Sequence, residues 1–512
     1  MLNTKKRGLL ASAGALVTAV ALALGGAAAA QAAPVDAMPD SSGLIITKLE
    51  QSGEGAETTG LKQTGLAGTP IAGVTFEAYQ VPLVHDPRSN DGQQEIADIT
   101  LADAKALVGE KAANRSGNTD AAGEIHWDST SGSGNLPAGL WLIRETGTPA
   151  GVVAAGDFLV ALPLTNPTNL DQWLDTVYVY PKNHTVTGTK TVKNAEDFVV
   201  GDTVTWTISV DNPSPRDPAT GAHVPADMLQ IIDELDGNFL TTAADGSGVK
   251  IPGFVKDTDY TVTVAPGTDN KTTVTIDFKA PGLEKIAGNA AAQVTLTLDT
   301  VIVQSGVVEN SARFFSSKAQ TTPKEIPGSE VKYGDFSLIK KSEGAPKDAK
   351  VNLAGAEFMV FGSEADARAA VKGDQAALKA ALKPVVTVPG YGQKTGVWTT
   401  NAEGRVDITG LRYSAFADGS VITDTDKIQT YWLVETKALE NHQLLAEPVS
   451  FLISGDVNAQ TQTSKEIVNQ YDRGGFVLPL TGGTGTLLLT VAGIALLAVV
   501  LIVARRRRHA AE

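Results

Sequence analysis

The chain has 512 residues, of which 42% are hydrophobic and 19% are charged, with a formal net charge of −15 at pH 7. This composition is typical of globular domains, and the length allows about three or four of them at roughly 100–200 residues each. The negative charge argues against nucleic acid as a partner, because binding to the phosphate backbone needs clustered Lys and Arg. Cysteine is absent, so an exported form of the chain would need covalent staples other than disulfides.

The beginning of the chain has the pattern of a secretory signal. Three basic residues at positions 5–7 precede an apolar stretch at 9–24, and residues 30–32 are Ala-Gln-Ala. Signal peptidase cleaves after small residues in this arrangement. We therefore expect residues 1–32 to be a signal peptide and the chain from Ala33 onward to be exported.

Most of the exported chain has the pattern of short β-strands. β-Branched and aromatic residues alternate with polar residues between Gly, Asn, Asp and Pro clusters, which is typical of strands in β-sandwiches. The clearest runs are residues 203–210, 260–264, 272–278 and 294–298. Two segments, 101–113 and 365–382, have helical patterns instead.

Two distant parts of the chain share three short patterns, which predicts an internal duplication. Residues 43–48, 71–76 and 139–146 correspond in order to residues 334–340, 353–358 and 430–436. The block between the copies lacks the second of these patterns, Ala-Gly-x-x-Phe. The sequence therefore predicts an all-β chain of three tandem immunoglobulin-like sandwiches, at residues 41–183, 184–330 and 331–470, followed by a short linker.

The first predicted sandwich ends in a motif that contains six spaced residues: Trp173, Val177, Val179, Tyr180, Pro181 and Lys182. From the residues alone this is an edge strand that ends in a solvated lysine. It also resembles the pilin motif of sortase-assembled major pilins, Trp-x-x-x-Val-x-Val-Tyr-Pro-Lys. The first and third predicted sandwiches resemble CnaB-type domains of Gram-positive adhesins and pilins, and the middle one resembles the CnaA type.

The C-terminal segment, residues 478–512, has three consecutive parts. The motif Leu478, Pro479, Leu480, Thr481, Gly482 precedes an apolar run at 487–504 and four arginines at 505–508. Eighteen apolar residues can form a transmembrane helix, and the arginines mark its cytoplasmic side, so these two features alone indicate a single-span membrane protein. The three parts together resemble the LPXTG sorting signal of Gram-positive surface proteins. That resemblance implies cleavage by sortase between Thr481 and Gly482, transient membrane anchoring, and linkage to peptidoglycan.

The pilin motif and the sorting signal together imply a head-to-tail polymer. In such pilins the motif lysine, here Lys182, is the amine that accepts the threonine carbonyl, here Thr481, of another copy. A donor at one end and an acceptor elsewhere on the same subunit make a contact that does not close, and such contacts build filaments.

The resemblance also implies internal Lys–Asn isopeptide bonds, each promoted by a buried carboxyl group. The candidates in the third sandwich are Lys340 and Asn469 with Glu435, and those in the middle sandwich are Lys190 and Asn310 with Asp233. Lys193 competes with Lys190, although the spacing of three puts the two lysines on opposite faces of a regular strand. The first sandwich has the corresponding residues Lys48, Glu145 and Asn183, and a bond is less expected there because Asn183 adjoins Lys182.

Patterns of other functional classes are missing. The six histidines have no metal-ligand spacing, and no cofactor, metal or hydrolase motif is present. Residues 85–91 are polar enough to hold calcium but lack the order of an EF-hand.

The sequence predicts the structural shaft subunit of a covalent pilus or fimbria on a Gram-positive surface, and not an enzyme. Its expected partners are sortase, further copies of itself and peptidoglycan, and the sequence leaves open a tip adhesin or minor pilin. The alternative is a monomeric wall-anchored adhesin for a host matrix protein or glycan. A wall-anchored hydrolase has no supporting residues.

Overall fold

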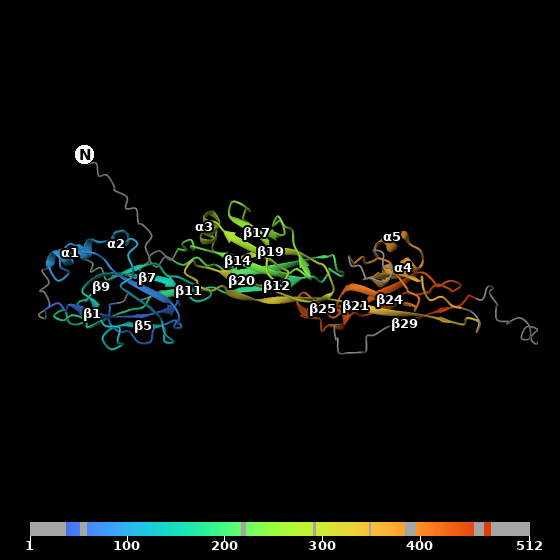
Figure 1. Ribbon diagram of the computed structural model, residues 1–512, viewed down its shortest axis with the longest axis horizontal. Coiled ribbons are helices and arrows are strands. Elements are labelled where there is room, and N and C mark those ends of the chain that lie inside the picture. The colour runs from blue at the N-terminus through green and yellow to red at the C-terminus, as the bar shows by residue number, and fades with distance from the viewer. Residues whose placement is uncertain are drawn as a thin grey trace, which may run out of the picture.

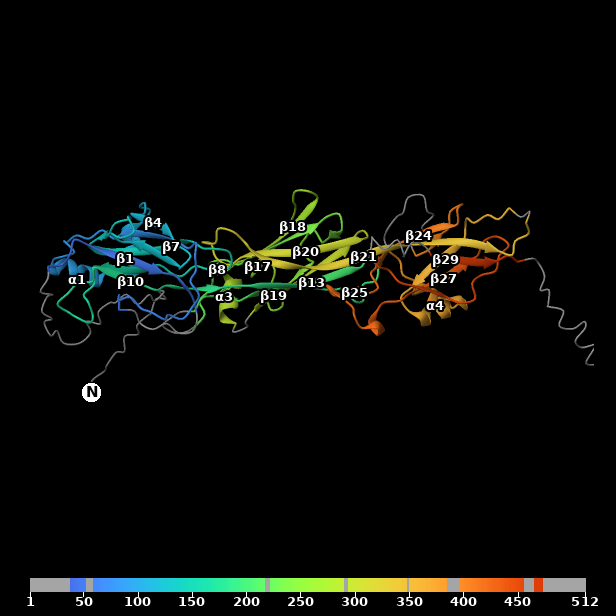
Figure 2. The ribbon, with the colours of Figure 1, turned by 90° about the horizontal axis from the view of Figure 1, so that it is seen from below.

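The computed structural model describes residues 37–51, 59–216, 222–289, 293–347, 350–384, 396–454 and 465–472. The chain forms an elongated molecule with three successive regions along its long axis (Figure 1; Figure 2). We call them the N-terminal region (37–185), the middle region (186–333) and the C-terminal region (334–472). Each region has a hydrophobic core of its own. The expected signal peptide and the expected sorting signal lie outside the described residues.

Among the residues that the structure describes, no helix is both long enough and apolar enough to cross a membrane.

The N-terminal region is a β-sandwich whose core is enclosed by two sheets. One sheet has the order β4–β3–β7–β9 and the other the order β10–β1–β5, with β6 beside β1. A small sheet, β2–β11–β8, lies at the end that faces the middle region. The bounds are Ser41–Thr47 (β1), Leu49–Glu50 (β2), Thr75–Gln80 (β3), Arg115–Asn118 (β4), Glu124–Trp127 (β5), Leu136–Pro137 (β6), Gly139–Gly147 (β7), Val152–Val153 (β8), Phe158–Leu162 (β9), Thr176–Val179 (β10) and Lys182–Thr185 (β11).

The middle region is a second sandwich, and several of its strands alternate between buried and more accessible residues. On β13, Val204, Trp206, Ile208 and Val210 face the core while the residues between them do not. One sheet has the order β12–β13–β19–β15, with β16 also beside β19, and the other begins β17–β18–β14–β20–β21. The bounds are Gly188–Lys193 (β12), Thr203–Asp211 (β13), Gln230–Asp236 (β14), Leu240–Thr241 (β15), Val249–Lys250 (β16), Tyr260–Pro266 (β17), Lys271–Phe278 (β18), Gln293–Ile302 (β19) and Gly306–Phe315 (β20).

One long strand joins the middle region to the C-terminal region. Strand β21 spans Lys324–Glu343, pairs with β20 in its first part, and pairs with β24 and β29 in its second part. The expected domain border at 330/331 falls inside this strand. The two regions therefore share a continuous seven-stranded sheet, and no flexible linker separates them.

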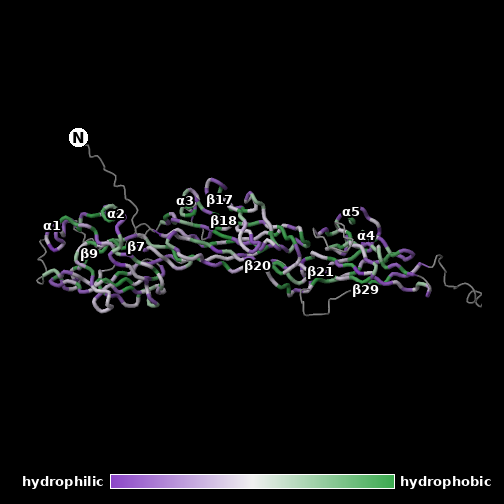
Figure 3. Tube along the Cα trace, in the orientation of Figure 1, coloured by the Kyte–Doolittle hydropathy of each residue, from purple (hydrophilic) through white to green (hydrophobic). Residues whose placement is uncertain are grey.

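The C-terminal region is a third sandwich, built from the end of that shared sheet and the sheet β23–β22–β27–β28. Hydrophobic and hydrophilic residues interleave along the strands of all three regions (Figure 3). The bounds are Glu357–Phe361 (β22), Trp398–Thr399 (β23), Arg405–Arg412 (β24), Phe416–Ala417 (β25), Ser420–Val421 (β26), Tyr431–Lys437 (β27), Val449–Phe451 (β28) and Lys465–Gln470 (β29).

The helices differ from the expected segments at their ends and in number. The expected helix 101–113 is α2, Leu101–Val108, and α1, Asn90–Asp98, precedes it. The expected helix 365–382 is two helices, α4 (Glu364–Val371) and α5 (Gln375–Lys379). Gly373 at φ 84° ends the first of these and the Asp374 side chain caps the second. Helix α3, Ala280–Gly288, was not expected, and a turn of 3₁₀ helix spans Thr425–Lys427.

The two regions predicted to be copies carry their helices at the same place in the fold. Helix α2 covers the outer face of β3 and β7 in the N-terminal region, and α4 covers the outer face of β22 and β27 in the C-terminal region. In both cases the helices lie between the strand that begins with the Ala-Gly-x-x-Phe pattern and the next strand of that sheet. The duplication therefore extends to parts where the two sequences differ.

Candidate functional site

The C-terminal region brings Lys340, Glu435 and Asn469 together in its core. Lys340 is on β21, Glu435 on β27 and Asn469 on β29, and all three are buried. The Lys340 Nζ lies 2.9 Å from Glu435 Oε1 and also contacts the Asn469 side-chain oxygen. The Asn469 amide nitrogen donates to both Glu435 oxygens at 3.0 Å. The lysine amine, the amide carbonyl and the carboxyl group therefore meet at one point.

The strand pattern explains this convergence. Phe336, Leu338 and Lys340 alternate along β21 and face the core, while Lys341 is exposed. Strand β29 runs parallel to β21, with Ser342 opposite Asn469. Side chains two residues apart on a strand share a face, so both members of the pair point inward.

The middle region brings Lys190, Asp233 and Asn310 into its core. Lys190 on β12 forms an ion pair with Asp233 on β14, and both side chains are fully buried. Its Nζ also donates to the Ser311 carbonyl oxygen at 3.2 Å. Neither polar atom of the buried Asn310 amide has a well-formed hydrogen bond among the described residues. Lys193, the competing candidate, is exposed.

The N-terminal region holds Lys48, Glu145 and Asn183 in an arrangement similar to that of the C-terminal trio. The Lys48 Nζ lies 2.7 Å from Glu145 Oε2, and the Asn183 amide nitrogen donates to Glu145 Oε1. The Asn183 side-chain oxygen has no partner among the described residues. Lys48 and Asn183 are at most 1% exposed. The two trios differ in one contact. The Lys48 amine contacts only the carboxylate of its trio, whereas the Lys340 amine contacts both the carboxylate and the asparagine side-chain oxygen.

Matching neighbours surround the lysines of these two regions. The backbone N–H of Lys48 donates to Gly123, and that of Lys340 donates to Gly404, each at 2.7 Å. The Nζ atoms lie 5.5 Å and 5.4 Å from the ring centroids of Phe76 and Phe358 respectively. Sequence analysis missed these phenylalanines as parts of the site. The signal was available, because each is the aromatic residue of the duplicated Ala-Gly-x-x-Phe pattern.

Burial sets the protonation of these groups. It lowers the pKa of the Lys48, Lys190 and Lys340 ammonium groups, although the carboxylate beside each lysine opposes the shift. Burial also raises the pKa of the Asp233 carboxyl, again against the effect of its lysine partner. A buried amine that loses its proton more readily becomes a better nucleophile, and a buried carboxyl group that keeps its proton can act as an acid.

Lys182 lies on the opposite face of the strand from the N-terminal trio. It begins β11, where alternation points Asn183 into the core and Lys182 away from it. The Lys182 ammonium group has no hydrogen bond or ion pair among the described residues. An amine in this position is open to a reaction partner.

The other residues of the motif hold the strand that leads to Lys182. Val177, Val179 and Pro181 are buried, and the Tyr180 hydroxyl accepts the backbone N–H of Gln63 at 2.7 Å. Trp173 is half-buried. The sorting motif, Leu478 to Gly482, lies outside the described residues.

In the loop at residues 85–91, considered for calcium, the Asp86 carboxylate has a partner within the loop, and Glu95 of α1 binds the start of the loop. Asp86 binds Arg88, and Glu95 accepts the backbone N–H groups of Val84 and His85. Across the described part of the chain, no group of three or more His, Asp or Glu side chains could hold a metal ion.

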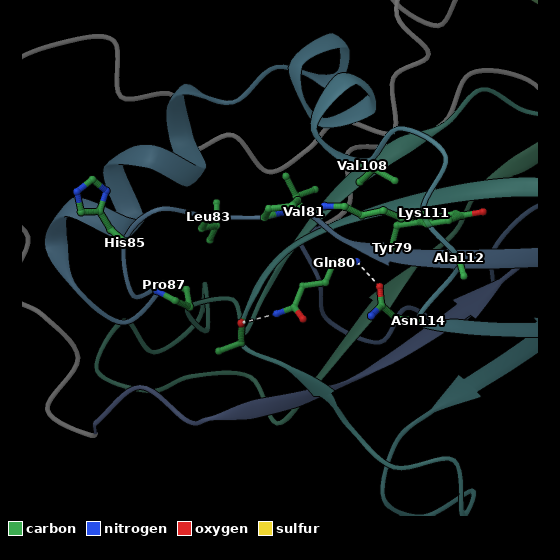
Figure 4. Close-up of a pocket in the computed structure, with 12 residues that line it drawn as sticks. Tyr79, Gln80, Val81, Leu83, His85, Pro87, Val108, Lys111, Ala112 and Asn114 are labelled. Atoms are coloured by element: carbon green, nitrogen blue, oxygen red, sulfur yellow. Dashed lines mark hydrogen bonds between the residues drawn. The ribbon is translucent and has the colours of Figure 1, made fainter.

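A cavity of about 410 Å³ lies at the end of the N-terminal region that carries the helices. Tyr79, Val81, Leu83 and Val108 line it together with Lys111, Gln80 and Asn114 (Figure 4). The Gln80 backbone N–H donates to the Asn114 side-chain oxygen at its edge. None of the residues predicted from the sequence as site residues lines this cavity.

Two family profiles match the chain. Residues 40–184 match the N-terminal domain D1 of Gram-positive pilin subunits, and residues 474–511 match the LPXTG cell wall anchor motif. The chain is 30% identical to a type 1 fimbrial subunit of Actinomyces viscosus, over 100% of this chain and 99% of the relative. It is 29% identical to a type 2 fimbrial subunit of Actinomyces naeslundii, over 86% of this chain and 85% of the relative.

Solved structures agree with these matches. The full-length major pilin SpaD of Corynebacterium diphtheriae is 26% identical with a TM-score of 0.55, over 85% of this chain and 98% of SpaD. The major pilin SpaA of the same species has a TM-score of 0.55 at 19% identity, over 84% of this chain and 100% of SpaA, and shares the fold. The immunoglobulin-like all-β architecture expected from the sequence is confirmed. This chain therefore belongs to the major pilins of Gram-positive bacteria, the fimbrial subunits that carry an LPXTG anchor.

Proposed function

We propose that this pilin forms the covalent shaft of a fimbria in which Thr481 of one copy is bonded to Lys182 of the next. The observation that carries the proposal is that one chain has both an LPXTG anchor match at residues 474–511 and a Lys182 amine with no partner among the residues that the structure describes. The subunit acts as a building block and as a substrate of sortase, and it turns over no substrate of its own.

The proposed linkage is an acyl transfer. Sortase breaks the Thr481–Gly482 amide and holds the Thr481 carbonyl as an enzyme thioester. The Lys182 amine attacks that carbonyl, the new amide forms, and the enzyme thiol leaves with the proton from the amine. Transfer to peptidoglycan in place of Lys182 ends the polymer and holds it in the cell wall.

We also propose that each of the three buried trios forms an internal isopeptide bond. The lysine Nζ attacks the Asn side-chain carbonyl carbon, the carbon–nitrogen bond of the amide breaks, and ammonia leaves with the proton supplied through the buried carboxyl group. Folding buries the lysine, the asparagine and the carboxyl group of each trio in one core, so proximity replaces an external catalyst. The lowered lysine pKa values support this chemistry, and Asp233 and Glu435 would be the promoters in the middle and C-terminal regions.

The proposal includes a bond between Lys48 and Asn183, because both side chains are buried and both contact Glu145. The lysine and the carboxylate of this N-terminal trio are as close as those of the C-terminal trio, at 2.7 Å against 2.9 Å. Within this proposal the three regions are tandem domains of the CnaB, CnaA and CnaB types. The structure of SpaA points to a modular pilus assembly with stabilising isopeptide bonds, and this property of SpaA is consistent with the proposed assignment.

A gel of cell-wall extracts tests the inter-subunit bond. Wild-type cells should give a ladder that resists boiling in SDS, and Lys182→Arg cells should give only monomer. Lys193→Arg is the matched control, because Lys193 is an exposed lysine on the next strand, and it should leave the ladder intact. A single monomer band in all strains would instead favour the monomeric wall-anchored adhesin.

A further inference from the structure

His184 follows Lys182 by two residues on strand β11, at the border between the N-terminal and middle regions (Figure 1). Side chains two residues apart on a strand stand on the same face, about 6.6 Å apart along the strand. Asn183 between them points into the core, so Lys182 and His184 both point away from it, and both are half-buried. The lysine side chain is long enough to bring its amine to the imidazole ring, directly or through one water molecule.

One contact determines which ring nitrogen of His184 carries a hydrogen. Its Nε2 lies 3.0 Å from the backbone carbonyl oxygen of Asn212 in the middle region. A carbonyl oxygen only accepts hydrogen bonds, so Nε2 is the donor, and in the neutral ring Nδ1 keeps its lone pair. Nδ1 has no hydrogen-bond partner within the described part of the chain. It is therefore available to accept a proton.

A fixed carboxylate of the middle region lies near this ring. Asp211, the residue before Asn212, accepts hydrogen bonds from the Thr187 backbone N–H at 2.9 Å and from the Thr187 hydroxyl at 2.6 Å. Burial acts to raise the pKa of Asp211, but the hydrogen bonds from Thr187 and Gln293 and the nearby His184 together lower it. Asp211 is therefore ionised at neutral pH, and its negative charge stabilises a positive charge on His184.

We propose that His184 is the proton acceptor for Lys182 when the inter-subunit bond forms. The inference deepens the proposed function and rests on the Thr481–Lys182 bond proposed there. An ordinary lysine has a pKa of about 10.4, so at neutral pH nearly all of it is the ammonium form, which has no lone pair and cannot attack a carbonyl carbon. An imidazole that can take the proton beside the amine removes this obstacle.

The three hydrogens of the Lys182 ammonium group have separate destinations. One moves to His184 Nδ1, which leaves a neutral amine and an imidazolium ring that Asp211 stabilises. The amine attacks the Thr481 carbonyl carbon of the sortase thioester, and the carbon–sulfur bond breaks. The second hydrogen leaves with the sulfur as the thiol, and the third stays on the nitrogen of the new amide. The imidazolium ring then returns its proton to solvent.

The His184→Gln variant separates this role from a structural one. Glutamine keeps an N–H group that can donate to the Asn212 carbonyl oxygen, but its side chain cannot take the proton. His85→Gln is the matched control, because His85 is exposed and lines the cavity at the far end of the N-terminal region.

Two assays compare these variants with wild type. The first follows the growth of the covalent ladder in cells after a pulse of label. The second adds a small acetyl thioester to the purified secreted chain, with and without imidazole, and measures acetylation of Lys182 by peptide mass spectrometry. The second assay needs no sortase, so it reports the reactivity of the Lys182 amine alone.

We expect His184→Gln to acetylate Lys182 about 100-fold more slowly than wild type, which is the lower end of the effect of a lost general base. Added imidazole should restore most of this rate, ladder growth should slow in the same variant, and His85→Gln should behave like wild type. Rates in His184→Gln equal to those of wild type in either assay, or slow acetylation that imidazole does not restore, would overturn the inference. A wild type that forms no ladder, or a ladder that persists in Lys182→Arg, would contradict the proposed function instead.

Discussion

Asn194 and Asp418 form a reciprocal pair across the junction of the middle and C-terminal regions. Asp418 Oδ1 accepts the Asn194 backbone N–H at 2.7 Å, and Asn194 Oδ1 accepts the Asp418 backbone N–H at 2.7 Å. The buried Arg412 adds a donor bond to the Ala195 carbonyl, and Val199 of the middle region packs in the C-terminal core. This polar clamp, residues 194–202 against residues 410–419, reinforces the joint that β21 already makes.

Removing the clamp should weaken the joint. Asn194→Ala deletes the acceptor for the Asp418 N–H, and losing this part-buried hydrogen bond costs about 0.5–1.5 kcal/mol. We expect this loss in the free energy of unfolding from urea denaturation. Lys193→Ala, an exposed neighbour, is the control and should change stability by no more than about 0.5 kcal/mol. Equal stability of both variants would show that β21 alone holds the joint.

The same clamp should be more stable at mildly acidic pH. Burial raises the pKa of Asp197 from 3.8 to about 6, and the nearby Asp202, Asp418 and Glu196 reinforce the shift while Arg412 opposes it. A carboxyl group whose pKa is raised by folding stabilises the folded state while it is protonated. The contribution of the Asp197 carboxyl group to the free energy of unfolding is therefore complete below pH 3.8, and it is lost as the pH rises through about 6.

The measurement is the melting temperature at about pH 5, 6 and 7, which brackets the raised pKa of Asp197. The wild-type chain should melt at a lower temperature at the highest of these pH values than at the lowest, and Asp197→Asn should reduce this difference because its side chain does not titrate. Asp171→Asn, which replaces an exposed carboxylate, should keep the wild-type difference. A wild-type slope that survives in Asp197→Asn would assign the effect to other groups.

Intact mass should reveal the internal bonds, because each one removes a molecule of ammonia. The secreted wild-type chain should be lighter than its sequence mass by three ammonia molecules. Glu435→Gln should restore one of them, since a carboxamide cannot carry the proton between amine and leaving group. Glu440→Gln changes an exposed glutamate of the same region. Its mass should still be lower than its sequence mass by three ammonia molecules.

The N-terminal trio needs a separate test because Asn183 adjoins Lys182, a lysine with a different proposed role. Lys48→Arg should restore one ammonia to the mass and lower the stability of the N-terminal region, while the covalent ladder persists, because Lys182 is unchanged. A loss of the ladder in Lys48→Arg would mean that the internal bond is needed to present Lys182. If the number of ammonia molecules missing from the sequence mass is the same in Lys48→Arg as in wild type, this trio remains a buried ion pair, with 2.7 Å between Lys48 Nζ and Glu145 Oε2.

Breaking one trio should also be costly to the fold. Replacing Asn469 by Ala removes the acceptor at Lys340 Nζ and leaves a buried lysine with one partner. Loss of a hydrogen bond to a charged group costs about 1.5–3 kcal/mol, and the Lys340–Glu435 ion pair remains, so most of any larger effect would come from the loss of the proposed cross-link. Thermal unfolding measures the sum, and the Lys341→Arg variant, with its exposed side chain, should melt like wild type.

Several parts of the site were within reach of sequence reasoning because they depend on local chemistry. Alternation along a strand separates Lys340 from Lys341 and Lys190 from Lys193, and the structure has the same separation in the burial of these side chains. The helix ends were less accessible. Gly373 and Asp374 divide one apolar, Ala-rich stretch into two helices, and their effect depends on packing against β22 and β27.

The sequence by itself determined the all-β class and the duplicated pattern, because these follow from strand periodicity and short motifs, and its resemblance to pilins implied the family and the residues of each trio. Only the tertiary structure decided that β21 passes through the expected border at 330/331, and that Asn194 meets Asp418, 224 residues away. It also decided that Lys48 and Asn183 both contact Glu145 in the N-terminal core. These contacts join residues that are far apart in the sequence. The local sequence around each residue does not indicate its partner, so the contacts cannot be predicted from local patterns.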